Sequence, residues 1–335
     1  MSYATMQDNT ATPPAVVPKR VAIVGSGVIG CGWAARALAA GCEVVAFDTD
    51  KAAAERRVAI TIDTAWPSLE KRGLAPTADR HNWRVTDDLA DAVGEADLIQ
   101  ENVPERTELK QQVLAAIDAA ARPDALIGSS TSGIKPTELQ AQCTVAPKRV
   151  FVAHPFNPVY LLPLVELVGG AQTSAATIDT AQAMYRGLGM RPLVVRREIE
   201  GFIADRLMEA LWREALHLVN DGVATTEEID AAVVYGAGLR WSLMGTFLTF
   251  HLAGGEDGMR HMLEQFGPAL KLPWTKLKAP ELTDELIERV VEGCEHQAAG
   301  RSVNALEARR DAFLTDMLAL VEQYWPEAEG LDGRI

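Results

Sequence analysis

The stretch Arg20-Val-Ala-Ile-Val-Gly-Ser-Gly-Val-Ile-Gly30, with Asp48 ending the next apolar run, decides the fold of this chain. Residues 20–24 are apolar and largely β-branched, which is typical of a buried strand. A glycine-rich turn and a helix follow, and residues 42–48 predict a second strand. A strand, such a turn, a helix and a second strand that ends in an acid together predict a dinucleotide-binding unit.

Each glycine of this turn has a physical role. Gly25 allows the tight turn, Gly27 lets a pyrophosphate approach the backbone, and Gly30 permits close packing of helix on strand. Val28 and Ile29 begin the helix, whose N-terminus faces the phosphates. The alternative is a glycine-rich turn that holds no ligand, which the full strand–turn–helix–strand context disfavours.

Asp48 predicts which dinucleotide binds. Its carboxylate accepts hydrogen bonds from the adenosine ribose hydroxyls and repels the additional phosphate of NADP, so NAD is the expected cofactor. Thr49 and Asp50 leave NADP open as the alternative cofactor, because they could rearrange around other contacts.

The rest of the chain extends the pattern into two parts. Further strands are expected at 83–85, 97–101, 125–129, 150–153, 164–168 and 191–195. Their alternation with helices predicts an α/β Rossmann-like, doubly wound parallel sheet. After Glu200 the apolar residues recur at helical spacing, which predicts an all-α C-terminal domain. The expected organisation is a flexible tail at 1–18, an NAD-binding domain at 19–198, a helical substrate and dimerisation domain at 199–322, and a tail at 323–335.

Composition excludes several function classes. Of the 335 residues, 48% are hydrophobic and 23% charged, and the net charge of −14 disfavours nucleic acid and anionic membrane surfaces as partners. No apolar run approaches a membrane span, and no secretion signal is visible. The four cysteines lack C-x-x-C spacing, so reduced thiols and a cytoplasmic location are expected.

The candidate for proton transfer is the histidine of His154-Pro-Phe-Asn-Pro158. It follows an apolar strand, where parallel-sheet enzymes place their sites, and an imidazole accepts protons near neutral pH. Glu166 lies inside another apolar run, and a buried carboxylate needs a partner. It could return on a neighbouring strand and orient the imidazole. The alternatives are that His154 is a core histidine and that Glu166 is a surface charge.

Clustered hydroxyls occur at Ser129-Ser-Thr-Ser-Gly133, after an expected strand. Ser132 could bond a substrate oxygen or the nicotinamide. Taken alone, the cluster is better explained as a helix cap or a polar loop.

Together these motifs resemble the 3-hydroxyacyl-CoA dehydrogenase superfamily, because GSGVIG, ENVPE, STS, HPFNP with LVELV, and GFIADR occur in that family's order. The resemblance covers residues 19–320. It implies a Rossmann-like domain, a helical dimerisation domain, a homodimer and a site at the hinge. It also implies that His154 and Glu166 are the catalytic pair, that Ser132 contacts substrate, and that Glu105 and Lys110 lie near the cofactor.

One departure points to the substrate. The family usually has asparagine in GFI-x-N-R, whereas this chain has Asp205, which would favour a cationic substrate. Within the superfamily the downstream sequence resembles the L-carnitine dehydrogenases. A trimethylammonium group is bound by aromatic faces and negative charge, and Phe202, Asp205 and Trp212 fall near one helical face, with Trp241 nearby in sequence. For the carnitine carboxylate the candidate is Arg240, with Lys110 and Arg206 as rivals.

The expected reaction is therefore NAD-dependent oxidation of L-carnitine to 3-dehydrocarnitine. The alternatives are a 3-hydroxybutyryl-CoA dehydrogenase, an L-gulonate 3-dehydrogenase and a crystallin-like NAD-binding protein without turnover. The remaining histidines form no metal motif with cysteine or acid, so no catalytic metal is expected.

Overall fold

The computed structural model of the chain describes residues 13–242, 245–254, 258–266, 268, 272–275, 283–285 and 301–324. The chain divides into two compact units, of which the first ends at Ile203 and the second begins at Ala204. The predicted tail at 323–335 lies almost entirely outside the described residues, as does the first part of the predicted tail at 1–18.

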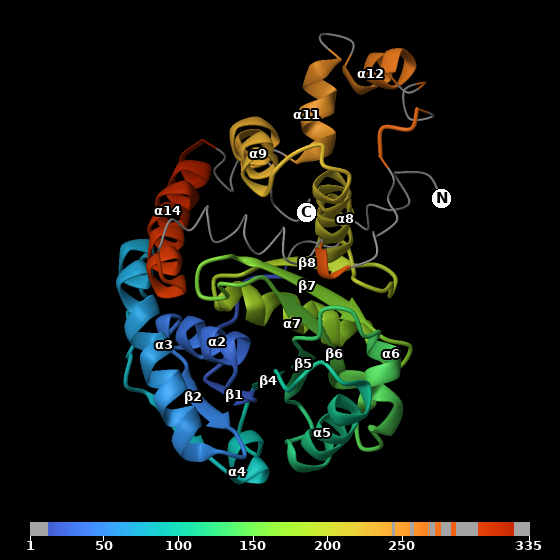
Figure 1. Cartoon of the computed structure of the whole chain (residues 1–335). Helices are drawn as coiled ribbons and strands as arrows, with labels where there is room; N and C mark the ends of the chain where they lie inside the picture. Colours follow the sequence, from blue (N-terminus) through green and yellow to red (C-terminus); the bar gives the residue numbers. More distant parts are fainter. Residues whose placement is uncertain are drawn as a thin grey trace. The chain divides into compact units, whose positions relative to one another are not determined.

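The first unit is built on one eight-stranded sheet with helices on both of its faces (Figure 1). Its order is β3-β2-β1-β4-β5-β6-β7-β8. The strands are β1 (Arg20–Val24), β2 (Glu43–Phe47), β3 (Trp83–Thr86), β4 (Leu98–Glu101), β5 (Leu126–Ser129), β6 (Val150–Pro155), β7 (Leu164–Gly169) and β8 (Arg191–Val195). The strand order reverses between β1 and β4, which is where doubly wound folds bind their ligands.

The sequence predicted a parallel sheet, but one pair of neighbouring strands is antiparallel. Strands β3 to β6 run parallel, but β6 pairs antiparallel with β7, and β8 then runs parallel to β7. The reason is the length of the connection at 156–163, since a parallel crossover needs about a dozen residues or more. The reversal places His154 directly opposite Glu166 in the register.

The helices of the first unit follow from caps and apolar periodicity. They are α2 (Val28–Ala39), α3 (Lys51–Arg72), α4 (Leu89–Val93), α5 (Thr107–Ala120), α6 (Pro136–Leu139) and α7 (Ala175–Gly187), with short 3₁₀ turns η1 (Gln140–Gln142) and η2 (Pro147–Arg149). The side chains of Asp50, Asp88 and Ser174 cap the N-termini of α3, α4 and α7. The core between helices and sheet is made of buried valine, isoleucine, leucine and alanine.

Every secondary-structure element that the structure describes in the second unit is helical. It comprises α8 (Ala204–Asn220), α9 (Thr226–Ala232), a π turn η3 (Val233–Ala237), α10 (Gly238–Trp241), α11 (Thr246–Ala253), α12 (Gly258–Phe266) and α14 (Val303–Tyr324). Thr225 and Glu228 form a capping box at the start of α9. Within these ranges, no helix combines the length and apolar character required to span a bilayer.

The segment at 13–18 differs from the predicted flexible tail. The backbone N–H of Val16 donates to the carbonyl oxygen of Ala183 at 2.9 Å. Arg186 donates to the carbonyl oxygen of Pro13 at 3.3 Å, and Pro18 is buried. These contacts with α7 join residues 13–18 to the first unit in this structure.

Candidate functional site

The glycine turn between β1 and α2 has the shape that a dinucleotide requires. Gly25 has a φ of +93°, and a Cβ there would lie 2.9 Å from the backbone of Asn102. A Cβ on Gly30 would lie 2.0 Å from the carbonyl oxygen of Gly25, so both glycines serve the packing of the turn. A Cβ on Gly27 would meet no protein atom within 4 Å. That open position, at the N-cap of a helix that no side chain caps, fits a bound pyrophosphate.

Asp48 follows β2 and faces the glycine turn. Its Oδ2 accepts hydrogen bonds from the backbone N–H and hydroxyl of Ser26, and its Oδ1 accepts from the N–H of Asp50 at 3.2 Å. Burial would raise the pKa of Asp48, but the hydrogen bonds from Ser26 and Asp50 and the charge of Arg57 together hold it below its usual value. The group therefore stays a carboxylate, as a ribose-binding acceptor requires.

A buried ion cluster lies where β4 and β5 end. Lys110 Nζ donates to Glu101 Oε1 at 2.9 Å and to the carbonyl oxygen of Val103 at 3.0 Å, and it lies 3.4 Å from Glu105 Oε2. The side chains of Lys110 and Glu101 are 2% and 0% exposed. Glu105 in turn accepts the backbone N–H of Ser132 at 3.1 Å. The predicted residues Glu105, Lys110 and Ser132 are thus connected, with the ammonium of Lys110 enclosed by protein.

The predicted proton acceptor and its carboxylate are in contact. His154 Nδ1 lies 3.0 Å from Glu166 Oε2, and their side chains are 7% and 0% exposed. Glu166 Oε1 accepts the backbone N–H of Ile203 at 2.9 Å. The rings of Phe156 and Phe202 stand 5.3 Å and 5.7 Å from the imidazole. The imidazole is therefore held in orientation by a buried carboxylate that is itself bound at both oxygens.

The connection at 201–203 reaches this pair through an unusual backbone. Phe202 is buried and has a φ of +47°, in the left-handed region that few non-glycine residues adopt. This conformation directs the ring of Phe202 toward His154 and the N–H of Ile203 toward Glu166. Strained residues of this kind concentrate at functional sites.

The other predicted substrate residues lie in the second unit. Asp205 is in the first turn of α8, three residues after Phe202, and Trp212 is farther along the same helix and 54% exposed. Arg240 and Trp241 are in α10, and both are exposed. The structure therefore brings Phe202 to His154 and describes Asp205, Trp212, Arg240 and Trp241 within their own unit.

Sequence reasoning missed three groups at this edge of the sheet. Glu101 had a usable signal, because an acid at the end of an apolar strand needs a partner, which was the argument applied to Glu166. Arg57 and the N–H of Ile203 had none, since their contacts with Asp48 and Glu166 join separate elements whose packing the sequence pattern does not give.

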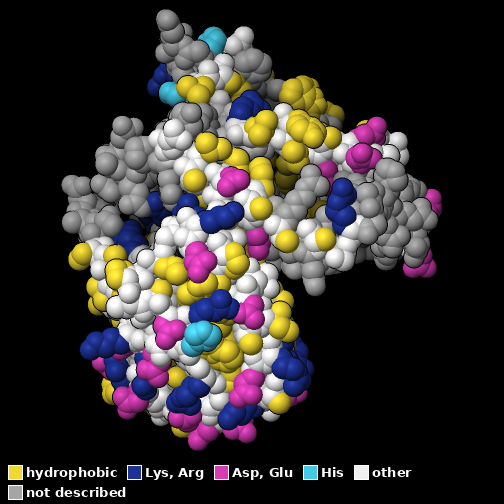
Figure 2. All heavy atoms as spheres, turned by 90° about the vertical axis from the view of Figure 1, so that its left-hand side faces the viewer, with side chains coloured by type: hydrophobic (Ala, Val, Ile, Leu, Met, Phe, Trp, Pro, Cys, Tyr) yellow, Lys and Arg dark blue, Asp and Glu magenta, His cyan; other side chains and the backbone are white. Residues whose placement is uncertain are grey.

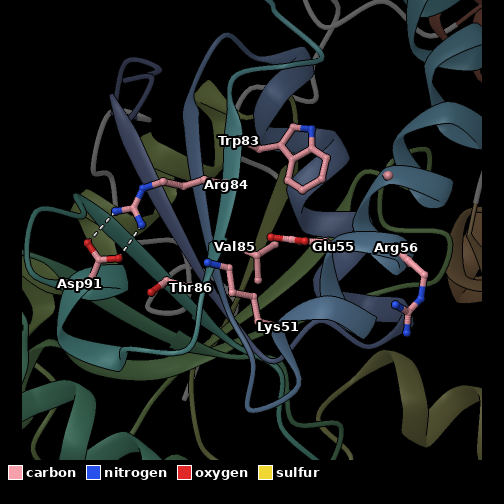
Figure 3. Close-up of a pocket in the computed structure, with 9 residues that line it drawn as sticks. Lys51, Glu55, Arg56, Trp83, Arg84, Val85, Thr86 and Asp91 are labelled. Carbon is pink, nitrogen blue, oxygen red and sulfur yellow. Dashed lines mark hydrogen bonds and ion pairs between the residues drawn. The ribbon is translucent and has the colours of Figure 1, made fainter.

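A further hollow lies away from these residues. A shallow groove of about 720 Å³ runs between α3 and β3, where Arg84 pairs with Asp91 and Trp83 lies across from Glu55 (Figure 3). None of the predicted site residues lines it. Among the described side chains, no three His, Cys, Asp or Glu residues are grouped so that they could hold a metal ion.

Comparisons with known proteins place this chain in a family. Residues 20–199 match the NAD binding domain of 3-hydroxyacyl-CoA dehydrogenase, and residues 201–293 match its C-terminal domain. An L-carnitine dehydrogenase of Bacillus cereus is 61% identical over 95% of this chain and 96% of its own length.

Two solved structures share the fold and part of the sequence. A 5-formyl-3-hydroxy-2-methylpyridine 4-carboxylic acid 5-dehydrogenase superposes with a TM-score of 0.75 at 29% identity, over 92% of this chain and 99% of the other. For a (S)-3-hydroxybutyryl-CoA dehydrogenase of Ralstonia eutropha the TM-score is 0.59 at 28% identity, over 84% and 94% of the two chains. The predictions of fold class and NAD cofactor are confirmed, and the chain belongs to the 3-hydroxyacyl-CoA dehydrogenase family.

Proposed function

We propose that this chain oxidises L-carnitine at its C3 hydroxyl to 3-dehydrocarnitine, with reduction of NAD. The observation that carries the proposal is the buried contact of 3.0 Å between His154 and Glu166, at the sheet edge where the glycine turn also lies. Identity of 61% with a protein named L-carnitine dehydrogenase, against 28% with a hydroxybutyryl-CoA enzyme, favours carnitine over an acyl-CoA.

The residues of this chain have distinct parts in the reaction. His154 Nδ1 is engaged by Glu166, so Nε2 is the ring atom that receives the hydroxyl proton. Glu166 keeps this tautomer and stabilises the imidazolium as it forms. Ser132 binds the reacting oxygen. The turn at Gly25–Gly30 and Asp48 hold NAD, which supplies the hydride acceptor.

Asp205 offsets the charge of the substrate trimethylammonium group. A cation that lacks N–H donors is recognised by negative charge and aromatic faces, which Asp205, Phe202 and Trp212 supply. Asp205→Asn is expected to raise the KM for carnitine more than the KM for NAD. The matched control is Asp87→Asn, a change at an exposed position in the first unit. An unchanged KM for carnitine would remove Asp205 from the site.

For the substrate carboxylate, Arg240 is the proposed partner. Lys110 is a poor candidate for this role, because its ammonium is enclosed by protein and bound by Glu101. Arg206 in α8 stays an alternative. Arg240→Lys and Arg206→Lys separate them, because a lysine keeps the charge and loses the bidentate grip. The larger rise in KM for carnitine identifies the residue.

The decisive experiment compares substrates. Purified protein with NAD is offered L-carnitine, L-gulonate and 3-hydroxybutyryl-CoA separately, and NADH absorbance is followed. Carnitine-dependent reduction with the highest kcat/KM supports the proposal. Preference for either other alcohol assigns the corresponding alternative, and NAD binding without turnover supports the crystallin-like alternative.

We also propose that the protein acts as a homodimer through its second unit. Exposed apolar side chains gather there (Figure 2), and α8 presents Leu207 and Met208 at 64% and 55% exposure. Apolar area of this kind marks an association surface. Light scattering after size exclusion tests this proposal, and a monomer at micromolar concentration would refute it.

A cytoplasmic location is proposed from the thiols. The cysteines that the structure describes are free and buried, as in reducing compartments. Immunoblots of fractionated cells test this location, and recovery in an exported fraction would contradict it.

A further inference from the structure

Arg57 in α3 binds both the glycine turn and the acid that selects the cofactor. Its Nε donates to the carbonyl oxygen of Ser26 at 2.8 Å. Its Nη2 donates to the hydroxyl of Ser26 at 3.0 Å and to Asp48 Oδ2 at 3.0 Å. One guanidinium of α3 thus contacts both the turn that follows β1 and the residue that follows β2.

The guanidinium lies at the surface, unlike the side chain of Ser26 that it binds. The side chain of Arg57 is 44% exposed and that of Asp48 19% exposed, whereas Ser26 is buried. Nη1 of Arg57 makes no hydrogen bond or ion pair within the described part of the chain. A ligand group placed beside Asp48 would therefore reach the same guanidinium.

General chemistry distinguishes two uses of this position. An acid at the end of the second strand accepts the ribose hydroxyls of NAD, whereas a nearby arginine accommodates the 2′-phosphate of NADP. This chain has both groups, in contact. The carboxylate of Asp48 pairs with the guanidinium at 3.0 Å, and its negative charge repels an incoming phosphate.

We propose that Arg57 determines cofactor specificity together with Asp48. While Asp48 is charged, Arg57 is engaged by it, holds the turn at Ser26 and leaves the ribose hydroxyls as the preferred ligand. When Asp48 is neutral, the same guanidinium becomes a binding site for a 2′-phosphate. This inference rests on the proposed use of NAD and assigns the residue that sets its selectivity.

A double-mutant cycle tests the proposal with Asp48→Asn, Arg57→Met and the double variant. Binding of adenosine 2′,5′-bisphosphate, which carries the diagnostic phosphate, is measured by calorimetry against 5′-AMP, and kcat/KM is measured with NAD and NADP. D48N is expected to bind the bisphosphate at least about tenfold more tightly than the wild type, the scale of one charge-assisted hydrogen bond. The double variant is expected to lose that gain.

The matched control is Arg56→Met. Arg56 is the neighbouring residue of α3 and lines the separate groove by β3 (Figure 3), so its loss removes the same charge without touching Asp48. R56M in the D48N background is expected to keep the tighter binding.

The proposal is overturned if D48N/R57M binds the bisphosphate as tightly as D48N, or if R56M abolishes the gain as R57M does. Melting temperatures of all variants show whether each is folded. Failure of the proposed function is distinct, since a wild type that reduces no NAD with carnitine would still give an interpretable binding cycle.

Discussion

Glu166→Gln isolates the charge of the carboxylate that orients His154. Glutamine has nearly the same shape and can still accept one hydrogen bond from the imidazole or from the N–H of Ile203, but it cannot offset the imidazolium that forms as the proton arrives. At about 4 Å and an effective dielectric constant of about 20, opposite unit charges attract by about 4 kcal/mol. The pair lies 3.0 Å apart and is almost fully buried, so solvent screens it little.

Part of that attraction is offset by desolvation and by the hydrogen bond that glutamine keeps, so a loss of about 2–4 kcal/mol is expected. Since about 1.36 kcal/mol corresponds to a factor of ten in rate, kcat is expected to fall about 30- to 1000-fold. The KM for NAD should change little, because Glu166 contacts neither the glycine turn nor Asp48 in this structure.

The assay is steady-state NADH formation, repeated with carnitine deuterated at C3. If proton acceptance is impaired, the loss appears in kcat at saturating NAD. Glu70→Gln, at an exposed position on α3, is the matched control and should retain full activity. A kcat for E166Q within threefold of the wild type, roughly 0.7 kcal/mol, would refute the proposed role of the carboxylate.

Other expectations concern the turn, the ion cluster and the thiols. Gly27→Ala should leave the melting temperature unchanged and raise the Kd for NAD by about tenfold or more, because the added Cβ meets only ligand. Gly30→Ala should instead lower the melting temperature, because its Cβ would lie 2.0 Å from the carbonyl oxygen of Gly25. Equal effects of the two in melting and calorimetry would contradict this. Lys110→Met leaves the buried carboxylate of Glu101 unpaired and should cost about 3–5 kcal/mol in urea unfolding, and a loss under about 1 kcal/mol would contradict that account. Burial raises the pKa of the Cys31, Cys42 and Cys143 thiols from 9.0 to about 11, about 12 and about 11. These thiols should therefore react slowly with a disulfide reagent near pH 8 until denaturant is added, and rapid labelling of the folded protein would contradict this. The stability that they contribute below pH 9.0 should be lost as the pH rises toward about 11.

Local sequence determined most of the first unit. The predicted strands at 20–24 and 191–195 coincide with β1 and β8. These elements could be predicted because apolar period and capping residues act over short distances along the chain. The glycine turn was predictable for the same reason, since its conformation depends on glycine itself.

The direction of β7 could not be predicted from its composition. A buried strand has the same apolar residues whether it runs parallel or antiparallel to its neighbour, and only the short connection at 156–163 indicates the reversal. The pairing of Arg57 with Asp48, and of Ile203 with Glu166, was equally hidden, because neither residue type nor spacing encodes those contacts.

By itself, then, the sequence determined a nucleotide-binding sheet, a helical second part, an imidazole and an acid of the right kind, because periodicity and side-chain chemistry are properties of neighbouring residues. Only the tertiary structure decided that His154 and Glu166 face each other across an antiparallel pair, that Lys110 is enclosed, and that Arg57 reaches Asp48. The physical reason is that distances between strands and helices depend on the packing of the whole unit, which no local stretch of chain specifies.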